Sequence, residues 1–323
     1  MRYTFHAGVF VDFVGGDTGA LRGALGFLGG VFSEVAWPPV EPFVRLRRGT
    51  LSRSLVCELG ALSPGTWVFC LGSGDVEAFT SDGLARLERN RGSVSVTPSA
   101  FGRYHLSGAL GAGISYVLGA RGCFFVHAAC FLLGKVCALV IADSGAGKSA
   151  LCAGALAASG RLISDDMVIV TAAAPDSHLI YAGRPDAYFS DAACRLLPRF
   201  YAGVLAEQGP ARKGKQALAR AVAPEAFISN ATPTHMLILD RAHPPSRVTV
   251  EPVCQAEALA ALVAASVRLA RSALTASLPS SETALRLASV VPAYRLQCPQ
   301  TLLTRPVEVM HQLLRQLESA ASQ

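Results

Sequence analysis

The sequence predicts an α/β protein, with a smaller β-rich domain over residues 1–99 and a larger domain over residues 100–323 in which strands and helices alternate. Two observations support the larger domain. Residues 136–141 are short, continuously apolar and rich in β-branched side chains, which is typical of a strand buried on both faces. Residues 149–159 have a helical pattern that ends at Gly160. With 51% apolar and 16% charged residues, the 323-residue chain can bury a substantial core, so disorder is excluded.

The first hundred residues alternate strand-like segments with turns of glycine, proline and serine. The segments cover residues 8–14, 42–47, 66–70 and 92–96. Because no cluster of catalytic side chains accompanies them, we expect this domain to recognise an acceptor or to form a dimer contact, with a scaffolding role as the alternative. Residues 101–120 predict an amphipathic helix at the start of the second domain.

A glycine-rich turn, ADSGAGKS at residues 142–149, joins the apolar strand to the helix. Backbone N–H groups and the positive end of the helix dipole converge at such a turn, which suits it to bind phosphate. Gly145 and Gly147 let the backbone curl around an anion, Lys148 would reach the β- and γ-phosphates, and the Ser149 hydroxyl would bind Mg²⁺. The usual pattern G-x-x-x-x-G-K-[ST] is missed only at Ala142, where alanine is acceptable if its φ is negative.

This turn therefore predicts a site for Mg²⁺ and a nucleotide, ATP or GTP, with an ordinary strand-to-helix turn as the alternative. The predicted nucleotide-binding residues are Asp143, Ser144, Gly145, Ala146, Gly147, Lys148 and Ser149.

Two adjacent carboxylates, Asp165 and Asp166, end the next strand pattern at residues 161–166. Because one helix separates this strand from the first, a right-handed crossover would place both strands in the same parallel sheet, with the carboxylates facing the turn. One carboxylate can hold Mg²⁺, and the other can accept a proton from an attacking hydroxyl. Asp240 ends another apolar segment, residues 236–240, and competes for the metal, but the adjacent pair supplies both functions and is favoured. A role in capping a loop is the alternative for the pair.

The chain resembles the catalytic domain of the HPr kinase/phosphorylase family and its diverged relatives in three elements that occur in the same order. They are His127 in an apolar strand, the glycine-rich turn, and the strand end at Asp165 and Asp166. The resemblance covers residues 125–170 and implies a P-loop fold related to the ATP-dependent phosphoenolpyruvate carboxykinases. It also implies that His127 lines the phosphate pocket, that Asp165 is the base, and that Asp166 binds the metal together with Ser149. Without the resemblance, His127 would be interpreted as a core histidine.

The chain departs from the bifunctional members of that family after the loop serine. They have glutamate where this sequence has Ala150. The chain is therefore more similar to the HPr-kinase-like maturation kinases, some of which modify serine in ribosomally made peptides. That comparison implies a serine-bearing peptide as the phosphate acceptor, by analogy alone.

Composition narrows the partners and the location. The net charge of +6 suits anionic nucleotides or acidic peptides but is too diffuse to indicate nucleic-acid binding. Nine cysteines without a C-x-x-C pair favour reduced, buried thiols over disulfides or zinc. The apolar stretch at residues 123–142 contains His127, Gly134 and Lys135, so we expect two buried strands there rather than a membrane span. The N-terminus lacks the pattern of a secretory signal, and we expect a cytoplasmic protein without a membrane partner.

Together these patterns predict an ATP- and Mg²⁺-dependent kinase that transfers the γ-phosphate to serine of a peptide or protein, with a small-molecule hydroxyl as the second acceptor class. Asp165, Lys148 and His127 are the predicted catalytic residues. The alternative is a nucleotide-binding regulatory or assembly protein with little or no kinase activity. Either function is compatible with a homo-oligomer.

Overall fold

The computed structural model describes sixteen segments of the chain. They are residues 2–5, 10–14, 32–34, 44–48, 57–63, 66–70, 76–80, 83–88, 93–96, 123–174, 177–183, 186–198, 215–220, 222–240, 245–270 and 281–320. The chain divides into two compact units, Met1–Phe125 with Ser266–Glu282, and Val126–Ala265 with Thr283–Gln323. The predicted domain boundary at residue 99 and the predicted helix at residues 101–120 lie outside the described residues and stay predictions.

Nine strands of the first unit form one sheet. They are β1 (Arg2–Phe5), β2 (Phe10–Val14), β3 (Phe32–Glu34), β4 (Val44–Arg48), β5 (Cys57–Ser63), β6 (Thr66–Cys70), β7 (Val76–Thr80), β8 (Gly83–Glu88) and β9 (Ser93–Val96). Their order is β3-β1-β2-β4-β9-β8-β7-β6-β5, with parallel pairing between β2 and β4 and between β4 and β9. Strands β2, β4, β6 and β9 lie at the predicted segments, so this part of the chain is built of strands as expected.

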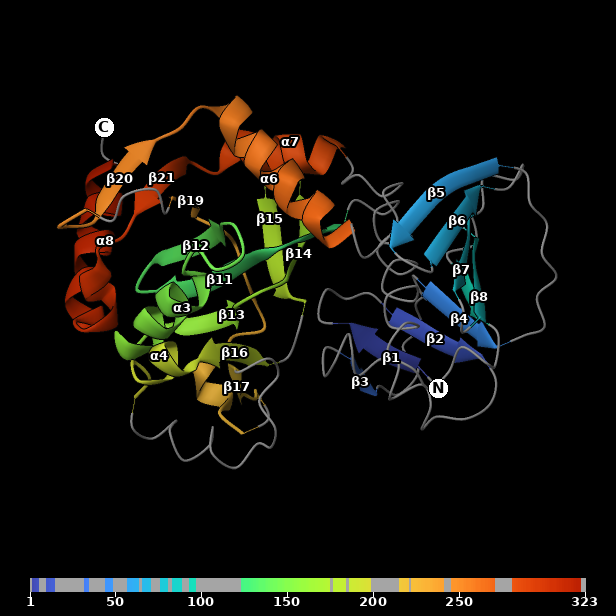
Figure 1. Cartoon of the computed structure of the whole chain (residues 1–323), viewed down its shortest axis with the longest axis horizontal. Helices are drawn as coiled ribbons and strands as arrows, with labels where there is room; N and C mark the ends of the chain where they lie inside the picture. The colour runs from blue at the N-terminus through green and yellow to red at the C-terminus, as the bar shows by residue number, and fades with distance from the viewer. Residues whose placement is uncertain are drawn as a thin grey trace. The chain divides into compact units, whose positions relative to one another are not determined.

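The second unit contains a mixed six-stranded sheet in the order β13-β11-β12-β19-β21-β20 (Figure 1). Its strands are β11 (Ala128–Leu133), β12 (Val136–Ile141), β13 (Arg161–Ser164), β19 (His235–Asp240), β20 (Thr249–Pro252) and β21 (Ala293–Gln297). All six residues of β12 are buried, as its apolar sequence predicts. Strands β12, β19 and β21 are parallel to one another.

The expectation of a parallel sheet is wrong at β11. This strand is antiparallel to both β12 and β13, and it lies between them. Strand β13 therefore belongs to the same sheet as β12 and runs in the same direction, but one strand away. The tight hairpin at Gly134 explains the insertion, because a two-residue turn returns the chain antiparallel to the preceding strand.

The remaining strands form smaller groups. Strand β10 (Cys123–Val126) precedes β11, and β14 (Val168–Ala174), β15 (Ser177–Ala182) and β18 (Asn230–Ala231) lie side by side in that order. Strands β16 (Ala187–Ser190) and β17 (Lys215–Leu218) form a two-stranded antiparallel ribbon. The helices are α3 (Lys148–Ala157), α4 (Asp191–Cys194), α6 (Gln255–Ala270), α7 (Ser281–Val290) and α8 (Pro306–Ala320), with 3₁₀ turns η2 (Pro224–Ala226) and η3 (Gln300–Leu303).

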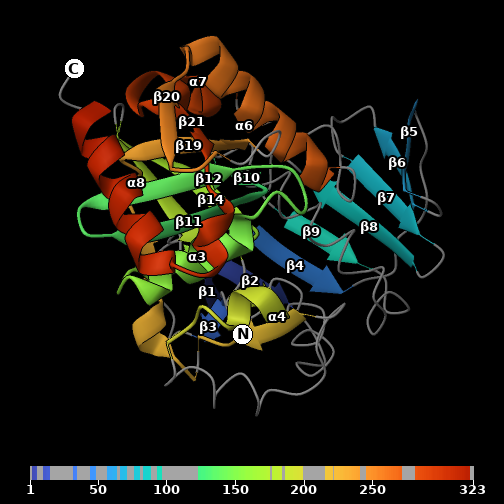
Figure 2. The same cartoon turned by 60° about the vertical axis from the view of Figure 1, so that its left-hand side comes forward.

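Helix α3 packs against β11 and β13 and against α8 (Figure 2). Its small residues permit this close approach: a Cβ atom at Gly154 would lie 3.4 Å from Met310 Cγ of α8 and 3.0 Å from Leu302 Cδ1 of η3. Leu151 of α3 is fully buried, together with Phe131 and Leu162 of the sheet. The segment that follows β12 is therefore anchored at both ends in a packed core.

Two further sequence predictions concern this part of the chain. The apolar stretch at residues 123–142 forms β10, β11 and β12. Among the helices that the structure describes, none is long and apolar enough to span a bilayer. Seven of the nine cysteines are free thiols in the structure: Cys123, Cys130, Cys137 and Cys152, which are buried, and Cys194, Cys254 and Cys298.

Candidate functional site

The turn between β12 and α3 has the backbone conformation that its glycines were expected to permit. Gly145 has a φ of +79° and Gly147 a φ of +111°, both rare for residues with a side chain. Ser159 is the only non-glycine residue of positive φ in the described segments, so Ala142 meets the condition under which alanine replaces the first glycine. The turn is closed by the Ala146 N–H, which donates to the Asp143 carbonyl at 3.2 Å.

The N-terminus of α3 opens onto this turn without a capping side chain. The helix begins at Lys148, its N-cap is Gly147, and no acidic residue lies in the first turn. The first N–H groups of a helix have no acceptor within the helix, and they carry the positive end of its dipole. Asp143, Ser144 and Gly145 are exposed beside them, and Ser149 is half-buried. This end of α3 is therefore suited to an anion.

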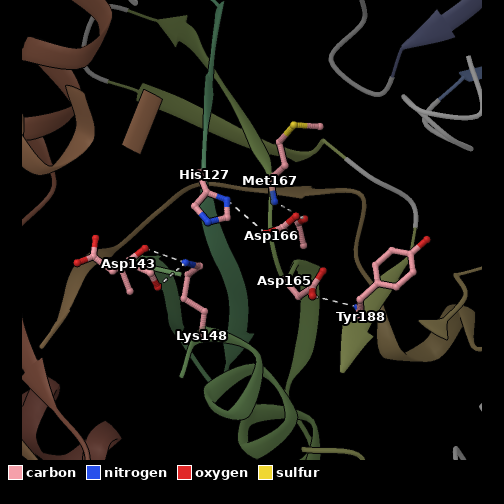
Figure 3. Close-up of polar contacts among 9 residues, drawn as sticks. His127, Asp143, Lys148, Asp165, Asp166, Met167 and Tyr188 are labelled. Carbon is pink, nitrogen blue, oxygen red and sulfur yellow. Dashed lines mark hydrogen bonds and ion pairs between the residues drawn. The ribbon is translucent and has the colours of Figure 1, made fainter. Parts of the chain in front are cut away.

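Lys148 folds back over the turn. Its side chain is buried, and Nζ donates hydrogen bonds to the carbonyl oxygens of Ala142 at 2.7 Å and Asp143 at 3.2 Å (Figure 3). Both acceptors directly follow β12 in the chain. The positive charge is therefore held by the main chain directly beside the N-terminus of α3.

The two adjacent aspartates after β13 lie in different surroundings. Asp165 is 2% exposed, and its Oδ2 accepts a hydrogen bond from the Tyr188 N–H at 3.0 Å. The Asp166 side chain is 32% exposed, and its Oδ1 lies 3.3 Å from Nδ1 of His127. Figure 3 shows the two carboxylates directed to these different partners. The structure thus joins the predicted residues His127 and Asp166 directly.

His127 lies between β10 and β11, and its main-chain N–H donates to the Ala265 carbonyl of α6 at 3.3 Å. Its side chain is 20% exposed and faces the Asp166 carboxylate. This position differs from that of a histidine enclosed in an apolar core.

A buried thiol connects Lys148 and Asp165 electrostatically. Burial raises the pKa of Cys152 in α3 well above its ordinary value, the negative charge of Asp165 raises this pKa further, and the positive charge of Lys148 lowers it. Because both charges act on one thiol, Lys148 and Asp165 each lie near Cys152 of α3.

Asp240, the competing metal ligand, also lies at the carboxyl end of a strand that is parallel to β12. Its strand β19 is the direct neighbour of β12, and its Oδ2 accepts a hydrogen bond from Gln297 Nε2 at 3.1 Å. Within the described part of the chain, no group of three or more His, Cys, Asp and Glu side chains could hold a metal ion. Mg²⁺ bound with a nucleotide commonly has few protein ligands, because phosphate and water oxygens complete its shell.

Sequence reasoning did not anticipate the contribution of Tyr188. Its contact with Asp165 uses the main-chain N–H, which almost every residue type provides, so no sequence signal marks the position.

No family model and no curated protein matches the chain. Among solved structures, the HPr(Ser) kinase/phosphatase from Coxiella burnetii is similar at 10% sequence identity and a TM-score of 0.32, over 60% of this chain and 98% of that one. A similarity this low does not support an inference about function, so the function must be derived from the residues of this chain. Membership of the HPr kinase family stays a prediction.

Proposed function

We propose that this chain is a Mg²⁺- and ATP-dependent kinase that transfers the γ-phosphate to a hydroxyl group, with serine of a peptide or protein as the acceptor. One observation carries the proposal: the buried Lys148 ammonium is held beside an uncapped helix N-terminus, at the end of a strand whose sheet also carries Asp165 and Asp166. Phosphoryl transfer requires fixed positive charge for the phosphates, a metal ligand and a proton acceptor.

The donor groups of the turn fit a nucleotide phosphate. The first N–H groups of α3 and the ammonium of Lys148 would hold the phosphate oxygens, and the positive φ of Gly145 and Gly147 shapes the backbone around them. Ser149 and Asp166 offer hydroxyl and carboxylate oxygens, the donor atoms that Mg²⁺ prefers. When bound, Mg²⁺ neutralises charge on the phosphates.

Asp165 is the proposed base. It accepts the proton of the acceptor hydroxyl while the hydroxyl oxygen bonds to the γ-phosphorus and ADP leaves. The Tyr188 N–H fixes the orientation of this carboxylate, and His127 fixes that of Asp166. With 2% of its surface exposed, Asp165 meets an acceptor only after neighbouring side chains move, so the proposal assigns the described conformation to the resting enzyme.

Transfer of γ-labelled phosphate from ATP to serine peptides tests the proposal, with Mg²⁺ present and nucleotide binding measured in parallel. We expect Asp165→Asn to lower kcat by about 10²- to 10⁴-fold, the usual contribution of a general base, while nucleotide affinity is retained. Asp166→Asn should raise the Mg²⁺ concentration needed for binding, and Asp240→Asn, the matched control at the end of β19, should not.

Three results would count against the proposal. Absence of nucleotide binding would remove the phosphate site itself. Tight binding without transfer to any acceptor would favour the regulatory function over the kinase. A shift of the Mg²⁺ dependence in Asp240→Asn but not in Asp166→Asn would assign the metal to Asp240.

A further inference from the structure

The strand that leads to the proposed base contains a β-bulge. Cys130 of β11 pairs with Ser164 of β13, but the next residue, Phe131, pairs with Leu162, so Ile163 is an extra residue without a partner on β11. A bulge takes the main-chain groups of the extra residue out of the ladder and turns the strand locally. Because this bulge lies two residues before Asp165, it sets the direction in which the chain enters the turn that holds Asp165 and Asp166.

Arg220 supplies the hydrogen bond that the bulge needs. Its Nη2 donates to the Ile163 carbonyl at 3.1 Å, and its Nη1 donates to the Ile228 carbonyl at 3.0 Å. Ile228 in turn donates its N–H to the Leu162 carbonyl at 2.8 Å. Strand β13 is the edge strand of its sheet, so these bonds satisfy the side of β13 that faces away from β11.

The guanidinium group is also fixed by packing. Its Cζ atom lies 4.9 Å from the centroid of the Phe227 ring, a cation–π distance. Burial lowers the pKa of Arg220, and the negative charge of Asp186 raises it. Burial has the opposite effect on an acid and raises the pKa of Asp186, while a hydrogen bond from the Arg220 main-chain N–H and the charge of Arg220 lower it. The charge of each residue therefore favours the ionised form of the other.

Asp186 lies at the start of the second segment that holds the base. It directly precedes β16, and Tyr188 of β16 donates its N–H to Asp165 Oδ2 at 3.0 Å. The Arg220 side chain thus contacts the bulge that precedes Asp165, and its charge acts on the residue directly before the segment whose N–H orients the carboxylate.

We propose that Arg220 is the positioning residue for Asp165: it holds the bulge at Ile163 in a fixed position, and so orients the carboxylate toward the Tyr188 N–H. The catalytic part of this inference rests on the proposed kinase function. Lysine cannot replace Arg220, because a single ammonium nitrogen lacks the planar fork whose two nitrogens donate to the Ile163 and Ile228 carbonyls while the group packs on the Phe227 ring. Arg220 acts without touching the substrate.

Hydrogen exchange of the purified full-length chain tests the positioning without requiring any activity. In Arg220→Met, we expect the peptide that contains Tyr188 to exchange faster by about tenfold to a hundredfold, the range expected for loss of a hydrogen bond from a charged donor. A peptide from α8 should keep its wild-type rate. Arg295→Met is the matched control, because it removes an arginine whose partner, Glu257, is exposed at the surface.

Kinetics test the catalytic part. We expect Arg220→Met to lower kcat by about tenfold or more with KM for Mg²⁺–ATP within about twofold of wild type, because the nucleotide site is not altered. Arg220→Lys keeps the charge and most of the length, and it should fail to restore kcat. If Arg220→Met does not fold, Arg220→Lys decides both measurements.

Wild-type exchange at Tyr188 in the Arg220 variants would overturn the inference. Faster exchange that is equally large in α8 would do the same, because it would show a general loss of structure. Accelerated exchange at Tyr188 with an unchanged kcat would overturn the catalytic part. If the wild-type chain transfers no phosphate, the proposed kinase function fails, and the exchange result still decides what Arg220 does.

Discussion

A Gly147→Ala substitution would test whether the conformation of the glycine-rich turn holds the phosphate-binding groups in place. Gly147 has φ +111° and ψ 9°. A Cβ atom there would meet only Leu239 Cδ2, at an ordinary contact distance of 3.8 Å. The cost is therefore backbone strain rather than collision, about 1–2 kcal/mol in the free energy of unfolding. Relief of that strain would rotate the first N–H groups of α3 and move Lys148.

Gly134→Ala is the control for strain alone. Gly134 has φ +59° in the hairpin between β11 and β12, and its Cβ would meet no atom within 4 Å. We expect both variants to lose about 1–2 kcal/mol in urea unfolding, but only Gly147→Ala to lose affinity for Mg²⁺–ATP in calorimetry, by about tenfold, as expected for one lost hydrogen bond. Equal affinity in the two variants, at equal loss of stability, would refute the assignment of the turn as the phosphate site.

Three further predictions concern the framework around the site. Phe131 is 1% exposed, so Phe131→Ala should lower the free energy of unfolding by about 3–5 kcal/mol in urea; a loss below about 1 kcal/mol would mean that the core refills the cavity. A Cβ atom at Gly160 would lie 2.7 Å from the Leu132 carbonyl oxygen and 2.8 Å from that of Ala155. Gly160→Ala should therefore lower the free energy of unfolding by about 1–3 kcal/mol and lower Tm in calorimetry. An unchanged Tm would contradict this geometry. Burial lowers the pKa of His235 in the folded protein below its ordinary value of 6.5. As the pH falls, the unfolded chain therefore binds the proton before the folded protein does. Stability that is present above pH 6.5 should fall as the pH drops below 6.5. Urea midpoints should fall less steeply with pH in His235→Asn, and parallel profiles would exclude this histidine as the cause.

The elements predicted best are those whose signals are local. Strand β6 at Thr66–Cys70 and strand β12 at Val136–Ile141 have the predicted bounds, because turn residues flank each run of strand-forming side chains. Helix α8 at Pro306–Ala320 also has a local signal, because its apolar residues recur at helical spacing.

Features that depend on distant contacts were not accessible from local patterns. The neighbour of β12 on one side is β11, although the sequence suggested a parallel partner, since a pattern of apolar residues does not state which strand lies beside it. The same limit applies to the candidate site. Lys148 and Asp165 were identifiable by residue type, whereas Tyr188 contributes a main-chain N–H and Arg220 binds main-chain carbonyl groups.

The adjacent aspartates show how position creates a chemical difference that residue type does not. Asp165 is buried against the N–H of β16, and Asp166 faces His127 with a third of its side chain exposed. An Asp165→Asn side chain keeps an oxygen for the Tyr188 N–H but buries an amide NH₂ where a carboxylate oxygen was, and a buried donor without an acceptor is costly. The same change at Asp166 places its NH₂ group at a partly exposed position, where water can accept its hydrogen bonds. A cost in stability is therefore expected at Asp165, while Asp166 should affect chiefly the contact with His127. The two carboxylates differ because Asp165 accepts a main-chain N–H of β16 at a buried position, whereas Asp166 faces the imidazole of His127 at a partly exposed position.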